Sequence, residues 1–385
     1  MKLKQVFSLI LCILLLLFTL VGCSSPDESI PDGADETDPN DPHTDSHIHD
    51  DDCFHSIDFE AAIATFPPET VMLSSDSLTI TWAQLYVFLF GMVSNLVHAY
   101  GPDIDWIEFV DYNYTFADAV LDYATEEALS FLTLSYGVSS LGLTLSDEDL
   151  EDFNDDLNSL ITEYGGREAF EETLRVNGGF YNLGVFEALF KIEFTLGVLI
   201  NELFGVDASA FPDEKVAEYA SQNGYMMALH ILRQKTDDDS PLGEIEDILE
   251  QLEDNLDADD FVGFFKELMI EHSEDPGSLM SYPEGYLFQH NDMVESFSDA
   301  CAALEIGQLS GIVETLYGYH IILRIPIDYD STPISFSYEG IYRSLRQHVA
   351  FIEFDTMQQQ WRDALNVVFS PEYNSIDLAA IFKAQ

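Results

Sequence analysis

Two histidines stand in segments that otherwise have the composition of buried strands. His230 lies in Tyr225–Arg233, which reads YMMALHILR, and His320 lies in Leu316–Ile325, which reads LYGYHIILRI. A buried imidazole needs a hydrogen-bonding partner, because an unpaired polar group away from water costs free energy. A single such histidine is commonly a satisfied core residue. Two of them, in separate strand-like segments about ninety residues apart, call for a further explanation.

A second group of histidines lies near the N-terminus, in the stretch HTDSHIHDDDCFH. Its members are residue types that bind Zn or another transition metal. They are His43, His47, His49, His55, Cys53 and the run Asp50–Asp52. No spacing among them matches a closed structural site, so the sequence assigns no metal site here. The alternatives are a weak metal-binding tail on these four histidines and a solvated acidic spacer.

The acidity of the chain excludes several classes of partner. Of its 385 residues, 14 are Lys or Arg and 71 are Asp or Glu, which gives a formal net charge of −57. A nucleic-acid backbone needs clustered cations, so nucleic acid is excluded as a partner, and direct binding to anionic lipid headgroups is disfavoured. The apolar content of 47%, with 13% aromatic residues, is ample for a folded core.

The N-terminus predicts export and a lipid anchor. Lys2 and Lys4 precede the apolar run Val6–Val21, which is the pattern of a signal peptide over residues 1–22. The sequence LVGC, which ends at Cys23, resembles the lipobox of bacterial lipoproteins, in which cleavage leaves that cysteine carrying lipid. We therefore expect acyl chains to tether the protein to the extracytoplasmic face of a bacterial cell membrane of the Gram-positive type.

The next two segments predict a tether, 23–58, followed by a helical domain, 59–224. The tether is acidic, contains several Pro, Gly and Ser residues, and cannot bury enough apolar surface to offset its chain entropy. From Thr81 onward apolar residues recur at helical spacing, and Thr81 and Gln84 have the spacing of a capping box. The aromatic residues of this domain have two interpretations: core packing, or a cradle of exposed apolar surface for unfolded clients.

From residue 225 the hydrophobic period changes. A strand, three helices and two further strands follow one another over 225–328, which predicts a small antiparallel sheet flanked by helices. Residues 329–385 return to helical composition, with one long helix from Tyr338 to Leu365 that packs on the first domain. The expected fold class is therefore an α+β domain inserted in an all-α, chaperone-like domain.

Five segments within 225–328 resemble, in order and in spacing, the motifs of parvulin-type peptidyl-prolyl isomerases. They read ALHIL, FFKELMIEHSED, EGYLF, MVESFSDACAALEIGQLSGIVET and YGYHIILRI. The lipobox, the helical domain and the returning C-terminal helix resemble the architecture of the PrsA-type and SurA-type extracytoplasmic foldases. The resemblance implies that His230 and His320 lie side by side on adjacent central strands, satisfy each other and orient a polar network under the active site.

The same resemblance implies a catalytic group of four residues. Asp275, in HSED, would face the substrate amide, and Thr315, in VET, would belong to the network of His230 and His320. The alternative interpretation of Asp275 is a solvated carboxylate at the end of a helix.

The resemblance also implies an apolar pocket for the proline ring. Met293 and Phe297, four residues apart on one face of the third helix, match the proline-pocket positions, and Phe288 would close the same pocket. Ordinary core packing is the alternative for all three. Cys301 lies on the same helix and is expected to be a packing residue.

Two segments depart from the family pattern. The loop that commonly reads Gly-Gly-Asp-Leu-Gly is SYPEGYLF here and keeps Gly285, which leaves one wall of the pocket undefined. After HIL the sequence is RQKTDDDSPL. Three aspartates that follow Arg233 and Lys235 would oppose a dianion, so specificity for phosphoserine-proline is disfavoured.

These features predict a membrane-anchored isomerase and foldase for unfolded or partly folded exported proteins with Xaa-Pro bonds. Rotation about that bond has a barrier of about 18–20 kcal/mol. A catalyst that favours the twisted amide needs an apolar slot and a few fixed polar groups, but no cofactor. Two alternatives stay open: a holding chaperone with little catalysis, and a metal-binding surface lipoprotein. A homodimer through the helical domain also stays open.

Overall fold

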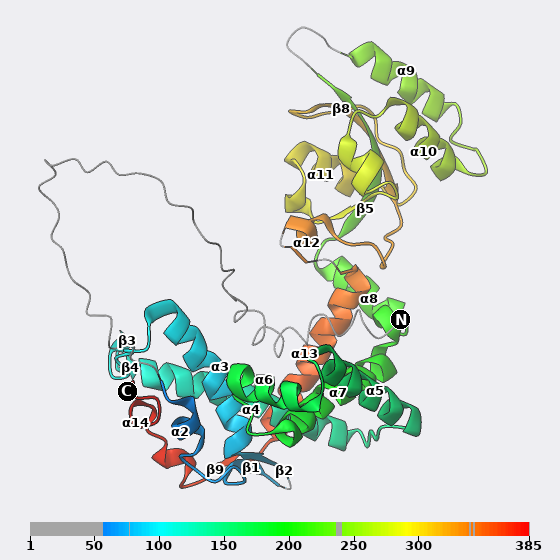
Figure 1. Ribbon diagram of the computed structural model, residues 1–385. Coiled ribbons are helices and arrows are strands. Elements are labelled where there is room, and N and C mark those ends of the chain that lie inside the picture. The colour runs from blue at the N-terminus through cyan, green and yellow to red at the C-terminus, as the bar shows by residue number, and fades with distance from the viewer. Residues whose placement is uncertain (1–56, 77, 236–240, 339, 342, 385) are drawn as a thin grey trace, which may run out of the picture. The chain divides into compact units, whose positions relative to one another are not determined.

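The computed structural model describes residues 57–76, 78–235, 241–338, 340–341 and 343–384 (Figure 1). Residues 1–22, Cys23 and the histidines His43, His47, His49 and His55 lie outside the described residues. The signal peptide, the lipidation of Cys23 and the metal-binding tail therefore stay predictions. The chain divides into two compact units. Unit 1 combines the residues up to Ile200 with Met357–Gln385, and unit 2 is Asn201–Thr356.

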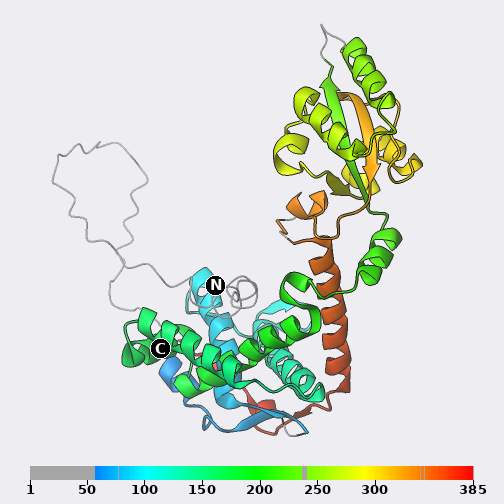
Figure 2. The same cartoon turned by 90° about the vertical axis from the view of Figure 1, so that its right-hand side faces the viewer.

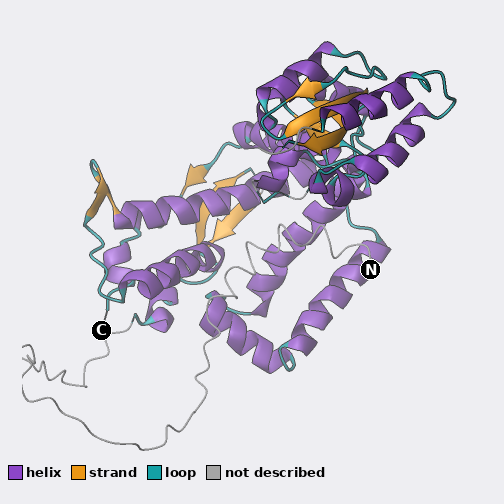
Figure 3. Ribbon diagram, turned by 90° about the horizontal axis from the view of Figure 1, so that it is seen from above, coloured by secondary structure: helices purple, strands orange, loops and turns teal. Residues whose placement is uncertain are grey.

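Unit 1 is built mainly of helices, with a few short strands (Figure 3). Its helices are α2 (Phe59–Ile63), α3 (Trp82–Tyr100), α4 (Phe116–Ser140), α5 (Asp147–Glu163), α6 (Arg167–Gly178), α7 (Leu183–Phe204), whose end enters unit 2, the 3₁₀ turn η4 (Tyr373–Ser375) and α14 (Leu378–Ile381). The strands β1 (Val71–Ser75), β2 (Leu78–Thr81) and β9 (Val368–Phe369) form an antiparallel sheet in the order β2-β1-β9, and β3 (Phe109–Asp111) and β4 (Tyr114–Thr115) form a hairpin. The sequence predicted the helices but not these strands.

Side chains at the helix starts explain where the helices of unit 1 begin. The predicted capping box of α3 is present, since the Thr81 amide donates to Gln84 Oε1 at 2.9 Å. In α5 the Asp149 amide donates to Ser146 Oγ at 3.1 Å, and the Ser146 amide donates to Asp149 Oδ2 at 2.8 Å. These bonds satisfy amides that have no partner within the helix. Within the described residues, no helix has the length and apolar character that a membrane span requires.

The C-terminal segment supplies part of the core of unit 1. Trp361 is buried against α4, and a Cβ added at Gly137 of that helix would overlap its ring. Arg362 forms an ion pair with Glu126 of α4 at 2.9 Å. Phe382 is fully buried and stacks on Tyr86 of α3 with ring centroids 6.0 Å apart. Trp361, Arg362 and Phe382 therefore contact helices α3 and α4 inside unit 1.

Unit 2 holds a four-stranded antiparallel sheet in the order β6-β5-β8-β7. Its strands are β5 (Met226–Gln234), β6 (Tyr286–Phe288), β7 (Val313–Glu314) and β8 (Gly318–Ile325). Its helical elements are η1 (Val206–Ala208), α8 (Asp213–Gln222), α9 (Leu242–Glu253), α10 (Phe261–His272), the π-turn η2 (Gly277–Ser281), η3 (His290–Asp292), α11 (Glu295–Ala303), α12 (Ile334–Tyr338) and α13 (Leu345–Ala364), whose end enters unit 1. Helices α9 and α10 lie on one side of the sheet and α11 on the other (Figure 1).

The register of the sheet places the chemistry on one face. Strands β5 and β8 run side by side in opposite directions through the unit (Figure 2). Opposite residues of an antiparallel pair share a face, and so do residues two apart along one strand. The pairs on the face of His230 are His230–Ile322, Leu232–His320, Ala228–Tyr286 and Met226–Phe288. Both histidines therefore belong to the same face of the sheet.

The long C-terminal helix is shorter than predicted. It was expected from Tyr338 to Leu365, but α13 begins at Leu345 and the preceding helix α12 ends at Tyr338. Gly340 between them has φ = +73°, which is outside the helical region. Ser344 then starts α13, because its amide donates to Gln347 Oε1 at 2.9 Å. Apolar periodicity could not show this break, because glycine occurs both inside and outside helices.

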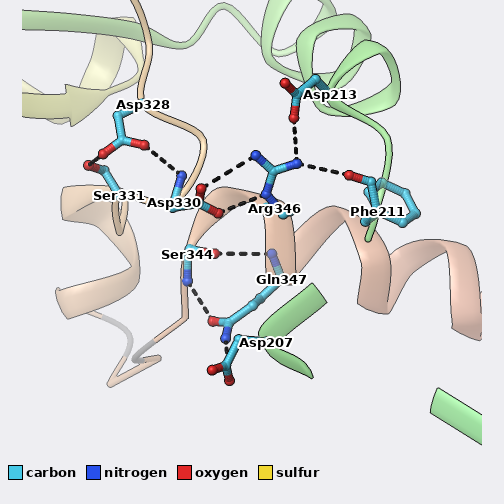
Figure 4. A network of polar contacts seen from close by, with 9 residues as sticks. All are labelled: Asp207, Phe211, Asp213, Asp328, Asp330, Ser331, Ser344, Arg346 and Gln347. Carbon is cyan, nitrogen blue, oxygen red and sulfur yellow. Dashed lines mark hydrogen bonds and ion pairs between the residues drawn. The ribbon is translucent and has the colours of Figure 1, made fainter. Parts of the chain in front are cut away.

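Arg346 of α13 ties together three segments of unit 2 (Figure 4). Its guanidinium forms ion pairs with Asp213 at the start of α8, at 2.6 Å, and with Asp330 after β8, at 2.7 Å. It also donates to the Phe211 carbonyl at 2.8 Å, and only 11% of its side chain is exposed. Hydrogen bonds to Asp330 and Asp213 raise the pKa of Arg346 above its ordinary value. This network explains why α8 and the first part of α13 belong to the same compact unit as the sheet.

Candidate active site

The two histidines of the opening motifs face each other on the central strands. The ring centroids of His230 and His320 are 5.3 Å apart, with the planes at 75°. Both residues are buried, at 5% and 4% exposure. The two rings touch edge to face, but no hydrogen bond joins them, and each ring instead has its own polar neighbour at Nε2. The expectation that they satisfy each other is therefore wrong in this respect.

Thr315 is the polar neighbour of His320. The Thr315 hydroxyl lies 2.9 Å from His320 Nε2, at the end of the short strand β7 that pairs with β8. The same hydroxyl accepts the Tyr317 amide at 3.1 Å, which fixes its position. Burial and the nearby His230 lower the pKa of His320 to about 3, although the carboxylate of Asp275 opposes this shift. His320 is therefore neutral at neutral pH.

Unit 2 should lose stability through His320 as the pH falls from about 6.5 to about 3. Between the ordinary pKa of 6.5 and the folded pKa of about 3, the unfolded chain binds a proton that the folded unit does not. The free energy of unfolding therefore decreases with decreasing pH across this window, by on the order of a few kcal/mol. Replacing His320 by Gln should flatten that dependence. The measurement is denaturant unfolding of the full chain at a series of pH values.

His290 provides the matched control for this titration. It is exposed and bonds Asp299 at 2.8 Å, and this hydrogen bond raises the pKa of His290. A raised pKa gives a pH dependence of stability with the opposite sign. The stabilisation it provides is complete below the unfolded pKa and is lost as the pH rises through the folded pKa. His290→Gln should therefore leave the acid-side dependence unchanged. An equal flattening in both variants would contradict the assignment to His320.

Asp275 lies just beyond α10 and points at His230. Its Oδ2 is 3.2 Å from His230 Nε2, accepts the Tyr286 hydroxyl at 2.8 Å and accepts the Ser278 amide at 2.9 Å. Its Oδ1 has a long contact of 3.4 Å with the Gly277 amide. The side chain is 20% exposed, so it is reachable from solvent without being freely solvated. This geometry differs from that of a free carboxylate at a helix end.

The surroundings of Asp275 keep it ionised. Burial alone raises the pKa of the Asp275 carboxyl, but the neighbouring His230, the Tyr286 hydroxyl and the Ser278 amide outweigh burial and hold that pKa well below its usual range. At neutral pH the site thus contains a fixed anion in contact with an imidazole. Both groups lie on the apolar face of the sheet.

An apolar cluster adjoins this pair of polar groups. Phe297 of α11 is 2% exposed, and its ring is edge-on to both His230 and His320, with centroids 5.2 Å and 5.4 Å away. Phe288 of β6 is fully buried, and its ring centroid lies 5.8 Å from that of Phe297. Met293 packs against the same cluster and is half-buried. The three predicted pocket residues therefore belong to one apolar cluster next to the histidines.

Met293 does not lie on the third helix as predicted. Helix α11 begins at Glu295, and Met293 is in an extended conformation with φ = −116° and ψ = 168° before it. The 3₁₀ turn η3, which is closed by Gln289 and Asp292, interrupts the chain at this point. Met293 and Phe297 thus reach the cluster from a loop and a helix, and the four-residue spacing between them is not a helical repeat. Cys301 of α11 is a fully buried free cysteine in the same cluster.

The sequence did not identify Tyr286, which completes the polar site. Its hydroxyl donates to Asp275, and its ring stacks flat on His230 with centroids 5.4 Å apart and planes at 2°. The segment EGYLF carried one usable signal, since a strand after Gly285 places Tyr286 and Phe288 on the same face. Which strand it joins depends on pairing across the chain, which no local pattern shows.

The cations near the site are paired with carboxylates. Arg233 forms ion pairs with Glu244 and with Glu274, the latter at 3.5 Å, and Lys235 forms an ion pair with Glu314. The three aspartates that follow Lys235 lie in 236–240, outside the described residues. Both cations are thus engaged by carboxylates, and the prediction that specificity for phosphoserine-proline is disfavoured stays a prediction. Within the described residues, no cluster of His, Cys, Asp and Glu is placed to hold a metal ion.

Comparison with known proteins identifies this domain. Residues 230–325 match the family model described as "Rotamase: PPIC-type PPIASE domain". Foldase protein PrsA of Halalkalibacterium halodurans is 29% identical over 236 residues, which are 59% of this chain and 63% of that protein. Foldase protein PrsA 4 of Bacillus cereus is 39% identical over 83 residues, which are 22% of this chain and 29% of that protein. The chain thus matches less than two thirds of the length of these relatives.

A PrsA peptidylprolyl isomerase structure from Bacillus cereus aligns with a TM-score of 0.29 and 18% identity, over 82% of this chain and all of that one. The family match runs from His230, within β5, to the end of β8, and it includes the histidine pair, Asp275, Phe288, Met293 and Phe297. Residues 230–325 therefore form a PPIC-type parvulin domain.

Proposed function

We propose that unit 2 catalyses cis/trans isomerisation of Xaa-Pro bonds. The observation that carries the proposal is the ionised Asp275 held against His230 beside the cluster of Phe297, Phe288 and Met293. The family match supports the reaction type. The apolar cluster binds the proline ring, and Asp275, His230, His320 and Thr315 form the polar side of the site.

The reaction requires only that the site favour a twisted amide. Resonance gives the planar amide its double-bond character and places partial negative charge on the carbonyl oxygen, and twisting removes part of that charge. A fixed anion near this oxygen therefore destabilises the planar state more than the transition state. Asp275 is the anion in this mechanism, and the buried rings of Phe297 and His320 keep the surroundings poor in water. The residues need no covalent intermediate.

Exchange NMR on proline peptides tests the proposal directly. Purified full-length chain should accelerate exchange between the cis and trans peptide signals at substoichiometric concentration. Uncatalysed exchange takes tens to hundreds of seconds, so acceleration is easily resolved. Peptide binding without acceleration would reject the isomerase and leave a peptide-holding domain.

We further propose that the protein works outside the cytoplasmic membrane on exported polypeptides, held there by lipid on Cys23. The support is the lipobox-like LVGC sequence and the identity to PrsA proteins that are named as foldases. Labelling of cells with a clickable palmitate analogue tests the anchor. Wild-type chain should carry the label and a Cys23→Ala variant should not.

Holding of unfolded clients by unit 1 is the second candidate function. One observation favours it: the hairpin β3–β4 and its flanks expose several large apolar side chains. They are Tyr100, Ile107, Phe109, Val110 and Tyr112, and Tyr112 is 91% exposed. Single exposed apolar residues are common, but a cluster of this kind on one hairpin suits contact with apolar polypeptide. A cavity of about 700 Å³ that includes Phe59, Tyr86 and Phe90 also opens on unit 1.

Replacing Phe109 and Tyr112 by Ser should weaken suppression of client aggregation. The expected loss is severalfold at equal protein concentration, because the variant removes the two exposed aromatic side chains of the hairpin without touching the buried core. Light scattering of a chemically unfolded substrate protein during dilution measures it. Ile270→Ser on α10 of unit 2, which is 70% exposed, is the matched control and should behave as wild type.

A further inference from the structure

Tyr286 reaches the site because two glycines make room for it. Gly285 precedes it with φ = +116°, and a Cβ there would lie 3.0 Å from the Ala228 carbonyl oxygen. This conformation brings β6 against β5, where Tyr286 pairs with Ala228, two residues before His230. A Cβ added at Gly277 would overlap the Tyr286 hydroxyl. The chain therefore has no side chain at the two positions that would prevent the approach of the phenol.

The phenol contacts both members of the Asp275–His230 pair. Its hydroxyl donates to Asp275 Oδ2 at 2.8 Å, and its ring lies parallel to the His230 imidazole. The outer face of the ring is covered by Tyr282, whose centroid is 4.7 Å away. Tyr286 is 9% exposed, so these contacts are shielded from solvent. A charge-assisted hydrogen bond of this kind is stronger than a neutral one and fixes the direction of the carboxylate.

The contacts at Asp275 leave its two oxygens unequal. Tyr286, Ser278 and His230 all approach Oδ2, whereas Oδ1 has only the long contact with the Gly277 amide among the described residues. A carboxylate with one oxygen occupied in this way presents the other oxygen in a fixed direction. The Tyr286 hydroxyl makes the shortest of these three contacts and is therefore one of the groups that set this asymmetry.

We propose that Tyr286 is a positioning residue for the isomerase site: its hydroxyl holds Oδ2 of Asp275, its ring fixes the His230 imidazole, and Oδ1 of Asp275 is thereby turned toward the substrate amide. This inference rests on the proposed isomerase function. Tyr286 acts through Asp275 and His230 and does not itself bind the proline ring. The titratable groups that face Asp275 are His230 on β5, His320 on β8 and Tyr286 itself on β6.

The variant Tyr286→Phe tests the hydroxyl while it keeps the stacked ring. We expect kcat for an Xaa-Pro peptide to fall about tenfold with little change in KM, because the hydroxyl supports the reacting group and not the proline pocket. In the same variant the pKa of Asp275, followed by the ¹³C signal of its carboxyl in the full chain, should rise toward its ordinary value. A residue with a purely structural role would not move that titration.

Two further variants separate position from packing. Tyr282→Phe removes the hydroxyl of the neighbouring ring, which bonds Ser337 at 3.1 Å and not Asp275, and it should leave kcat and the Asp275 titration unchanged. Gly277→Ala displaces the Tyr286 hydroxyl without altering Tyr286, so it should reproduce the effects of Tyr286→Phe.

The outcomes distinguish this inference from the proposed function. An Asp275 titration and a kcat that are both the same in Tyr286→Phe as in wild type would overturn the positioning role. If the wild-type chain shows no catalysis but Tyr286→Phe still shifts the Asp275 titration, the isomerase proposal fails and the contact between Tyr286 and the carboxylate is confirmed. Equal effects of Tyr282→Phe and Tyr286→Phe would show that only packing of the two rings matters.

Discussion

Replacing Asp275 by Asn should lower kcat/KM for Xaa-Pro isomerisation by roughly ten- to a hundredfold, which corresponds to a loss of about 1.4–2.7 kcal/mol of transition-state stabilisation. Asn has the same shape and can still accept the Tyr286 hydroxyl and the Ser278 amide, so the fold of η2 and β6 should persist. The variant lacks the negative charge that acts on the carbonyl oxygen of the substrate. Exchange NMR on a short Xaa-Pro peptide measures the loss.

The neighbouring carboxylate supplies the control for this experiment. Glu274 accepts the Gln234 amide at 2.7 Å and lies 3.5 Å from Arg233, so its carboxylate is held by groups other than those that hold Asp275. Glu274→Gln removes the same amount of charge one residue away and should retain most of the activity. Equal losses in the two variants would show that the overall field of the acidic surface matters and that the Asp275 contact does not. Unchanged activity in Asp275→Asn would reject the anion mechanism.

Continuous apolar runs were enough to predict the two strands that carry the histidines. Apolar runs around His230 and His320 allow only a buried strand, and the period of two then assigns each histidine to a face. The prediction that His230 and His320 lie side by side came from the resemblance to parvulins, and the register of β5 and β8 agrees with it. Helix starts at Thr81 and Ser146 were equally predictable, because a capping box is a contact within four residues.

Contacts between distant segments were not predictable in the same way. Tyr286 contacts Asp275 because β6 pairs with β5 and because Gly277 has no side chain to block the phenol. No local sequence pattern indicates either feature. The helical interpretation of Met293 failed for a related reason. Its spacing from Phe297 fits a helix, but the capped turn η3 ends just before it and forces an extended residue. Spacing alone cannot distinguish a helical face from a loop that returns to the same cluster.

The division of unit 1 between two chain segments has an energetic consequence. The segment after Met357 contributes the buried side chains Trp361 and Phe382 and the sheet strand β9 to unit 1, and the rest of the unit comes from residues up to Ile200. The stability of unit 1 therefore depends on side chains that are added to it only after the whole of unit 2 along the chain. Trp361 is the largest of these side chains, and its ring packs against α4 at Gly137, where a side chain would overlap it.

Trp361→Ala should destabilise unit 1 by about 3–5 kcal/mol, the usual cost of removing a buried aromatic ring. Calorimetry of the full chain should show the transition of unit 1 at a clearly lower temperature, while the transition of unit 2, whose core does not include Trp361, stays in place. Gln360→Ala, at the adjacent exposed position of α13, is the control and should shift neither transition. If both transitions fell together in Trp361→Ala, the two units would unfold as one cooperative body. If neither fell, the C-terminal segment would not be a necessary part of the core, and the ring on Gly137 would be a surface contact.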